Sequence, residues 1–419
     1  MKRITLLLFY ILAIYPFFAF LLRQIIDVRP NFVFSIIYFS LFLYIILTKK
    51  NVRLPKYLLF YLFFVVYTIV GDVNNGKIDN QEFVTMSFGL PLFITYFMKN
   101  NVIATFFIFF IVENSFFPKS FIKNIIRILF VIVVVAVLVI IIQAYSPKFF
   151  LSPREFDIAI DRGEQRKFSI FSWINTSEAG YTFPAFLSIL LSLNIIYANK
   201  IKVKWLYFFG IIYSVLSGAR FVILSVLIVF SQAISYGKKF MPNLIKATGG
   251  LVFLVAISYS VLKFSGINID RMISHRIIQS DVGEFEYNSA YTRIYAFTLF
   301  SEFFPERPIF GTGGVMEDDL IETKGSTTSQ IHVGWLSLLY YYGIVGGTFY
   351  IIFTYLIMKK LYRVAKATNY WGSFFVFITY FISVMGTGVS FEINFMGYIF
   401  ALVLNKYFEQ QLNQKTVLT

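Results

Sequence analysis

The sequence predicts an all-helical protein that crosses a membrane about twelve times and carries a large helical segment on the outer side. Three observations predict this class. Hydrophobic residues make up 58% of the chain, the mean hydropathy is +0.72, and apolar runs of about 20 residues recur along almost the whole length. No linker rich in Pro, Gly or Ser divides the chain, so residues 1–419 are predicted to form a single membrane domain.

About twelve apolar stretches are candidate spans, and several of them are short. They cover residues 4–22, 31–47, 57–71, 83–98, 128–145, 181–198, 205–217, 221–236, 245–264, 334–358, 371–385 and 395–404. The first follows Lys2 and Arg3 as a signal peptide would, but no small-residue cleavage site follows it, so we expect it to remain as a span. The run 103–112 is too short to span and precedes Glu113, so we expect it to be interfacial or re-entrant.

Clusters of basic residues orient these spans. They occur at residues 49–56, 119–127, 200–204, 238–239 and 359–366, all on one side of the predicted spans. Because short loops rich in Lys and Arg stay in the cytoplasm, we predict that this side and both termini are cytoplasmic. The net charge of +15 follows from these loops, and a nucleic-acid partner is not needed to explain it.

Arginine is concentrated on the other side. Four of the 22 cations assigned to the cytoplasmic side are Arg, whereas ten of the 15 outer cations are Arg. Orientation does not require Arg there, and its planar guanidinium suits phosphate or carboxylate oxygens held by two bonds. Pairing with outer acids is the alternative. Most of these arginines lie in two long outer stretches, 146–180 and 265–332, and loops of that length are usually functional.

The second outer stretch contains SAYTRIYAFTLFSEFF, whose apolar periodicity predicts a helix that breaks at Pro305. PIFGTGG follows, and its glycines would let the backbone approach a ligand closely, although glycine is also ordinary turn chemistry. The chain has no Cys and two His, which excludes a disulfide framework, a thiolate nucleophile and a Cys- or His-rich metal site. A Walker lysine motif is absent, so ATP-driven transport by this chain alone is not expected.

Four pieces of the chain, in this order, resemble the superfamily of O-antigen polymerases and O-antigen ligases, which are glycosyltransferases of the bacterial envelope. They are RKFSIFSWINTSEAGYTFPAF, LSGARFVILSV, YTRIYAFTLFSEFFPERPIFGTGG and IHVGWLSLLYYYGIVGGTFYI. The last two are the most specific, with an Arg, a Pro-x-x-Gly-x-Gly turn and a His that opens a helix reaching Gly-x-x-Gly. The resemblance covers about residues 166–350. Val333 and Ala219 depart from the family's usual Asn and its usual Ser or Thr.

The resemblance implies a GT-C-like fold in the bacterial inner membrane and transfer of a glycan from an undecaprenyl-pyrophosphate carrier, with no metal and no cofactor. The favoured activity is a polymerase that moves the growing chain from a lipid-linked oligosaccharide donor to a lipid-linked acceptor. A ligase that transfers the glycan to the lipid A-core is the close alternative, and a flippase of lipid-linked oligosaccharides is the alternative from another class. Membrane lipid and a chain-length regulator protein are implied partners.

The family's arginines are matched by Arg166, Arg220 and Arg293, and the resemblance assigns them to the pyrophosphate, with Arg276 as a weaker fourth. Fixed arginines can stabilise the charge that a leaving pyrophosphate accumulates, which makes Arg293 a candidate catalytic residue. For Arg220, which lies between two apolar runs at the outer side, the alternative is that its side chain reaches the phosphate of a lipid headgroup.

The acceptor hydroxyl must lose a proton, and His or a carboxylate commonly takes it. His332 is the matched candidate, with positioning of the acceptor or capping of the following helix as its alternative role. Glu178, near Arg166, is the second candidate, and a salt bridge is its alternative. Aromatic residues that could stack on sugars are Trp173, Tyr291, Tyr295 and Trp335.

Overall fold

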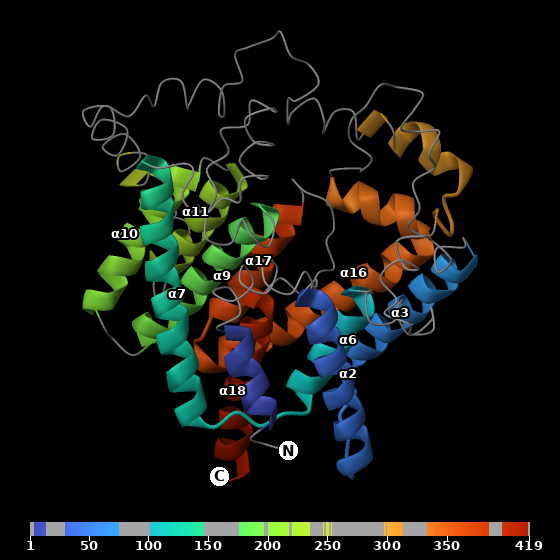
Figure 1. The fold of residues 1–419 in the computed structure, drawn as a ribbon, viewed down its shortest axis with the longest axis horizontal. Helices are drawn as coiled ribbons and strands as arrows, with labels where there is room; N and C mark the ends of the chain where they lie inside the picture. The colour runs from blue at the N-terminus through green and yellow to red at the C-terminus, as the bar shows by residue number, and fades with distance from the viewer. Residues whose placement is uncertain are drawn as a thin grey trace.

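The computed structural model of the 419-residue chain describes residues 4–13, 30–74, 101–145, 176–196, 200–217, 220–234, 300–312, 333–384 and 396–417, together with 246, 249–250, 253 and 297–298. Apart from turns, these residues are helical, and no strand occurs among them (Figure 1). The all-helical class predicted from the sequence is confirmed.

The α-helices are α2 (Pro30–Thr48), α3 (Lys56–Asn74), α6 (Asn101–Glu113), α7 (Lys119–Tyr145), α9 (Thr176–Ile196), α10 (Lys200–Ser217), α11 (Arg220–Ile234), α16 (Gly334–Thr368), α17 (Gly372–Val384) and α18 (Met396–Val417), and η5 (Phe304–Glu306) is a 3-10 helix. Another apolar helix covers Ile4–Ala13. Most predicted spans coincide with one of these helices. The predicted span 83–98 and most of 245–264 lie outside the described residues.

Three described helical stretches are long and apolar enough to cross a membrane: Lys56–Asn74, Lys119–Ile142 and Gly334–Thr368. Shorter apolar helices cover Ile4–Ala13, Phe34–Thr48, Val102–Glu113, Phe183–Leu193, Val222–Ile234 and Gly372–Phe381. The predicted number of about twelve crossings therefore stays a prediction.

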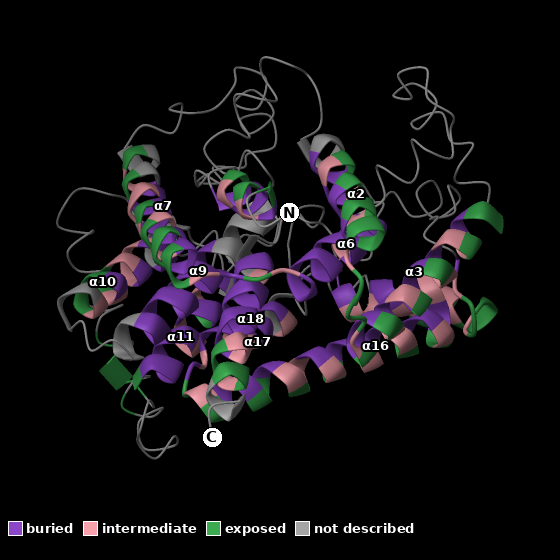
Figure 2. Cartoon of the chain, turned by 90° about the horizontal axis from the view of Figure 1, so that it is seen from below, coloured by how far each residue is buried: buried purple, intermediate pink, exposed green. Residues whose placement is uncertain are grey.

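The centre of the described bundle is α9. It packs against α7, α10, α11, α17 and α18, and residues 183–193 within it are all buried. A helix that is apolar on all sides is expected to be buried on all sides. Figure 2 shows buried residues gathered on α9, α11 and α18, with exposed residues on the outer faces of α2, α3 and α7.

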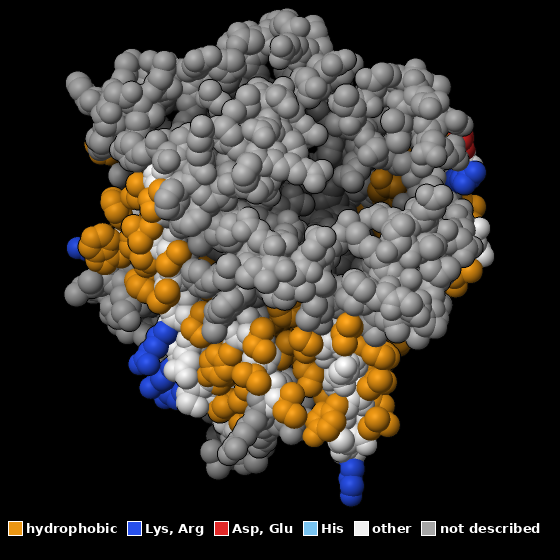
Figure 3. All heavy atoms as spheres, in the orientation of Figure 1, with side chains coloured by type: hydrophobic (Ala, Val, Ile, Leu, Met, Phe, Trp, Pro, Cys, Tyr) orange, Lys and Arg blue, Asp and Glu red, His pale blue; other side chains and the backbone are white. Residues whose placement is uncertain are grey.

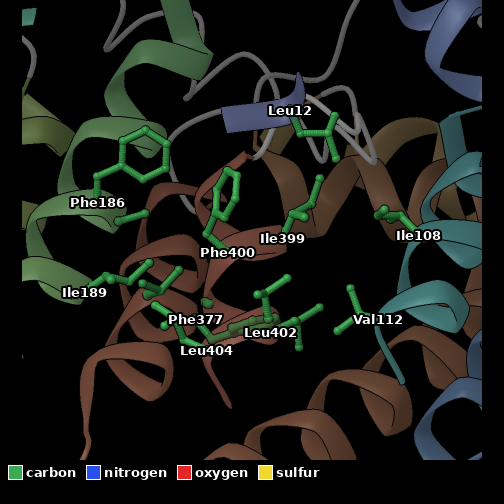
Figure 4. Packing of buried hydrophobic residues seen from close by; sticks show 14 of the residues in the cluster. Leu12, Ile108, Val112, Phe186, Ile189, Phe377, Ile399, Phe400, Leu402 and Leu404 are labelled. Carbon is green, nitrogen blue, oxygen red and sulfur yellow. The ribbon is translucent and has the colours of Figure 1, made fainter. Parts of the chain in front are cut away.

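Large apolar side chains fill the space between these helices. Phe186 and Ile189 of α9 face α17 and α18, which supply Phe377 and Phe400 (Figure 4). The rings of Phe186 and Phe400 meet edge to face with centroids 6.1 Å apart. An edge-to-face pair places the positive edge of one ring on the negative face of the other, which stabilises this contact beyond the apolar area that it buries.

One polar group joins three of the central helices. The Gln232 side chain of α11 donates a hydrogen bond from Nε2 to the Ser192 hydroxyl of α9. Ser188, also on α9, lies 3.0 Å from Oε1 of Gln232 and 3.1 Å from the carbonyl oxygen of Gly372 at the start of α17. Hydrogen bonds of this kind between apolar helices fix their relative positions because the alternative is an unsatisfied polar group.

The short helix α6 is deeply buried among other helices. Residues 103–112 were expected to be interfacial or re-entrant, but α6 is buried on almost every side and packs against α2, α3 and α18. A helix lying at an interface keeps a polar, exposed face, and α6 has no such face before Glu113. This burial fits a re-entrant helix packed inside the bundle better than an interfacial one, and the expectation for residues 103–112 stays a prediction.

The outer stretch 265–332 is described in part. Residues 297–298 and 300–303 are helical, and the chain then passes into η5, which contains Pro305. The predicted helix and its break at Pro305 are confirmed for these residues. Residues 265–296, 299 and 313–332 of this stretch, and residues 146–175 of the first outer stretch, lie outside the described residues.

Candidate functional site

Three helices begin at one end of the bundle, which we call the mouth end. Only three residues join α9 to α10, and two join α10 to α11, so α10 runs back between two helices that share a direction. Gln232 binds α9 at Ser188 and Ser192, ten or more residues after α9 begins and twelve after α11 begins. At a rise of about 1.5 Å per residue, the first turns of α9 and α11 therefore lie at about the same level.

The start of α16 lies at this end too. The ring of Trp335, in the first turn of α16, lies 4.5 Å from the ring of Phe381 near the end of α17. The other end of α17, at Gly372, is bound to Ser188 in the middle of α9. Because α17 packs along α9, its last turns reach the level at which α9 begins.

Two predicted site residues belong to these helix starts. Glu178 lies in the first turn of α9, and Arg220 is the first residue of α11. Val333, which directly precedes α16, follows the predicted base His332. His332 itself lies outside the described residues, as do three further predicted residues, Arg166, Arg276 and Arg293. Their roles stay predictions.

Of the predicted sugar-stacking residues, Trp335 is described, and its half-buried ring packs against Phe381 and Tyr350. Trp173, Tyr291 and Tyr295 lie outside the described residues. Within the described part of the chain, no three His, Asp or Glu side chains come together to hold a metal ion.

The glycine-rich turn of the second outer stretch docks on a break in α16. We call residues 307–312 the strap. Gly343 interrupts α16 with φ 61° and ψ −169°, and the strap supplies the hydrogen bonds that a continuous helix would make there. Ile344 N donates to Pro308 O at 2.9 Å and Val345 N to Ile309 O at 3.1 Å, while Thr312 N donates to Tyr340 O at 3.0 Å.

Two glycines make this approach possible. A Cβ on Gly311, which has φ 69°, would lie 2.5 Å from Gly343 N, and a Cβ on Gly343 would overlap the carbonyl of Ile309. The neighbouring atoms are backbone and cannot move aside, so each glycine is needed for the other's position. The glycines of PIFGTGG were expected to admit a ligand. At Gly311 the group that comes close is the backbone of α16.

A second helix, α3, also contacts the strap. The Tyr67 hydroxyl of α3 donates a 2.7 Å hydrogen bond to the carbonyl oxygen of Phe310. The ring of Tyr67 also lies against Gly346, where a Cβ would come within 2.7 Å of the ring. The Gly-x-x-Gly pair of the sequence motif, Gly343 and Gly346, thus accommodates the strap with its first glycine and the tyrosine that binds the strap with its second.

A buried group of charges lies at the opposite end, which we call the base end. Glu113, the last residue of α6, is 6% exposed and pairs with Lys360 of α16 and, at 2.9 Å, with Lys406 of α18. The Tyr57 hydroxyl of α3 donates to the same carboxylate at 2.6 Å. Glu409 lies 3.4 Å from Lys360 and 3.3 Å from Lys406. We call these five residues the base cluster.

The base cluster keeps Glu113 ionised. Burial by itself would raise the pKa of Glu113, but the charges of Lys360 and Lys406 and the hydrogen bonds from Lys360 and Tyr57 lower it to about 2. A buried carboxylate that pairs with two cations is well satisfied. Removing the carboxylate or the lysines would leave the remaining groups as costly buried charges.

Asn114 extends this contact to the loop between α2 and α3. Its Oδ1 accepts a 2.8 Å hydrogen bond from Arg53 N, and its Nδ2 donates to Arg53 O at 3.0 Å. Lys49 donates to Asn114 O at 3.0 Å, and Gln410 of α18 donates to Ser115 O at 3.0 Å. Together with Lys360 of α16, these contacts bring four segments that are distant in sequence to the base end: residues 49–53, 113–115, 360 and 406–410.

Sequence reasoning did not identify the base cluster. Glu113 was noted as the residue that follows a short apolar run, Lys360 was assigned to the basic cluster 359–366, and Lys406 was not singled out. A carboxylate directly after an apolar run, among loops rich in Lys, is the signal that could have suggested a buried ion pair.

Comparison with known proteins adds no relative: no family model matches the chain, and no curated protein matches it.

We predict that Glu113→Gln lowers the free energy of unfolding by about 3–5 kcal/mol, because Lys360 and Lys406 would lose the carboxylate that balances their buried charge. Equilibrium unfolding of the purified protein in detergent measures this change. Glu302→Gln is the matched control, since Glu302 is exposed. A loss below about 1 kcal/mol, the range of exposed pairs, would contradict the structural role of the base cluster.

The pH dependence of unfolding in the wild type and in Glu113→Gln tests the lowered pKa of Glu113. Since the pKa of Glu113 falls from 4.5 to about 2 on folding, its contribution to stability is complete above pH 4.5 and is lost as the pH falls toward 2. The unfolding free energy of the wild type should therefore decrease over this range more steeply than that of Glu113→Gln. Equal slopes would show that Glu113 does not titrate as its surroundings require.

Proposed function

We propose that this chain is a multi-pass membrane protein. The apolar character of its exposed surface supports this. On α3, the exposed side chains Leu59, Phe63, Val66, Val70 and Val73 follow one another at spacings of four and three, so they form one stripe along the helix. Figure 3 shows hydrophobic side chains covering much of the described surface in that view, with Lys and Arg at its margins. Water is a poor solvent for such a surface, whereas lipid is a good one.

We further propose that the base end faces the cytoplasm and that both termini lie there, in a bacterial inner membrane. The hydrogen bonds that join residues 49–53, 114–117 and 406–410 support a shared side for these loops. The basic clusters 49–56, 119–127 and 359–366 adjoin these contacts or take part in them. A single face that gathers short basic loops is typical of the cytoplasmic side.

The absence of Cys from the natural sequence allows a direct test of this orientation. We predict that a membrane-impermeant maleimide labels Ser301→Cys in intact spheroplasts and labels Lys123→Cys only after the membrane is opened, because the two exposed positions would lie on opposite sides. Labelling of both variants from outside, or the reverse pattern, would refute the proposed topology.

For the activity, we propose glycosyl transfer at the mouth end: a polymerase that uses a lipid-pyrophosphate-linked oligosaccharide as donor and a second one as acceptor. The single observation that carries this proposal is that α9, α11 and α16 begin at one end. Glu178, Arg220 and the residue after His332 thereby come to one face of the bundle. The four sequence pieces that resemble the polymerase and ligase superfamily include all three helix starts.

The proposed step needs no metal. The acceptor hydroxyl oxygen attacks the anomeric carbon of the donor glycan, and the bond from that carbon to the pyrophosphate oxygen breaks. Arg166, Arg220 and Arg293, with Arg276, would hold the pyrophosphate and stabilise the charge that it gains. His332, or Glu178 in its place, would accept the hydroxyl proton. A ligase would use the same donor chemistry with a different acceptor.

Reconstitution with an undecaprenyl-pyrophosphate-linked repeat unit tests this proposal. We predict a ladder of products from the wild type and a loss of turnover of at least about a hundredfold in Arg293→Ala, because a fixed charge on the leaving group is removed. Arg363→Ala, an exposed arginine of α16 on the proposed cytoplasmic side, is the matched control and should keep full activity.

The products separate the alternatives. Transfer only to added lipid A-core would identify a ligase, and movement of the lipid across the bilayer without transfer would identify a flippase. Full activity of Arg293→Ala would remove Arg293 from the pyrophosphate site.

A further inference from the structure

The break in α16 is unusual because the helix could close without it. Residues 334–368 contain no Pro, and Gly343 can adopt helical angles as easily as the ones it has. In a continuous helix, Ile344 N would donate to Tyr340 O and Val345 N to Tyr341 O. The observed broken form is therefore one of two hydrogen-bonded arrangements that are open to this segment.

The hydrogen bonds of the strap favour the broken form of α16 over the continuous helix. When it is docked, Tyr340 O accepts from Thr312 N, and Ile344 N donates to Pro308 O, so the helix's own donor and acceptor are both occupied by the strap. In a closed helix, the same two groups would be paired with each other. Backbone groups that are kept from water are almost always paired, so we expect helix closure to accompany undocking.

We propose that strap docking holds the mouth half of α16, residues 334–342, in the direction required for the proposed reaction, and that Tyr67 is a positioning residue that stabilises the docked form. This proposal rests on the proposed function for its catalytic consequence. The break itself stands on the contacts of the strap with Gly343 and Tyr67. Closing the helix at Gly343 would reorient the half of α16 that directly follows His332.

Tyr67 is suited to this role because it touches both partners. Its hydroxyl binds the strap at Phe310 O, while its ring lies on α16 at Gly346. Since α3 packs along α16, Tyr67 joins the strap to a helix that the base cluster also holds, through Tyr57 and Glu113. Motion of the strap would therefore be opposed by a scaffold that is fixed at its far end.

Spin-label distances in the otherwise Cys-free chain test the docking. We place labels at Ser301→Cys, just before η5 and the strap, and at Thr348→Cys, on α16 after the break; both positions are exposed. A second pair, Val66→Cys and Thr348→Cys, lies on the packed helices α3 and α16 and serves as the rigid reference. The wild type should give one narrow distance distribution for each pair.

Gly311→Ala should broaden and shift the Ser301 to Thr348 distribution, because its Cβ would meet Gly343 N and its φ is unfavourable for Ala. Gly343→Ala should do the same and also favours the closed helix. Gly347→Ala is the matched control, since its Cβ would meet only the flexible end of Leu339. It should match the wild type. The reference pair should not change in any variant.

Tyr67→Phe tests the positioning residue with little risk to folding. It removes one hydrogen bond, so the undocked population should rise about two- to tenfold, whereas Tyr355→Phe, an exposed tyrosine of α16, should leave it unchanged. In the reconstituted assay, kcat of each variant should fall in proportion to its docked fraction, with KM for the donor unchanged.

Three results would overturn parts of the proposal, and they are distinguishable. A narrow, unshifted distance in Gly311→Ala would show that the strap does not hold the break. An undocked strap with wild-type kcat would show that docking does not position the reacting groups. Expected distances in a wild type that forms no product would refute the proposed function and leave the docked strap in place.

Discussion

A backbone N–H or C=O that is surrounded by apolar side chains must find a hydrogen-bond partner, and this constraint is sharpest at Gly343. There α16 gives up its internal bonds, and the strap replaces them with Pro308 O, Ile309 O and Thr312 N. The replacement ties a stretch between two groups of predicted spans to the longest helix of the described bundle. The outer stretch cannot be repositioned without changing the path of α16.

The two ends of α16 are held by different chemistry. At the mouth end the bonds are between backbone groups, and their geometry depends on glycines that bring two chains close together. At the base end, Lys360 is held by the buried carboxylate of Glu113, which also binds α18 and α3. A buried ion pair is a weak source of stability compared with apolar packing but is costly to break, so it favours one arrangement of helices over others. The base end is therefore suited to act as the fixed end and the mouth end as the adjustable one.

The sequence was sufficient to predict the helices because an apolar run has a local signature. The helix before Pro305, the apolar run that forms most of α11 and the all-helical class follow from periodicity and composition. The partners of Glu113 do not, since Lys406 lies 293 residues away and no local pattern encodes that distance. Gly311 was noted as a residue that allows close approach, yet the identity of the approaching chain depends on the fold. The burial of the short helix α6 was not predicted, because the length of its apolar run was weighed, whereas its uniformly apolar surface, which predicts burial, was not.

Amide hydrogen exchange resolved to single residues tests the partner exchange at Gly343 most directly. In the wild type, the amides of Thr312, Ile344 and Val345 should all exchange slowly, because each donates a hydrogen bond across the contact between the strap and α16. In Gly311→Ala, the Thr312 amide should exchange quickly while Ile344 and Val345 remain protected, because the closed helix gives them new acceptors in Tyr340 and Tyr341. Fast exchange at all three amides in Gly311→Ala would contradict the two-state break and show that α16 simply unravels there when the strap is lost.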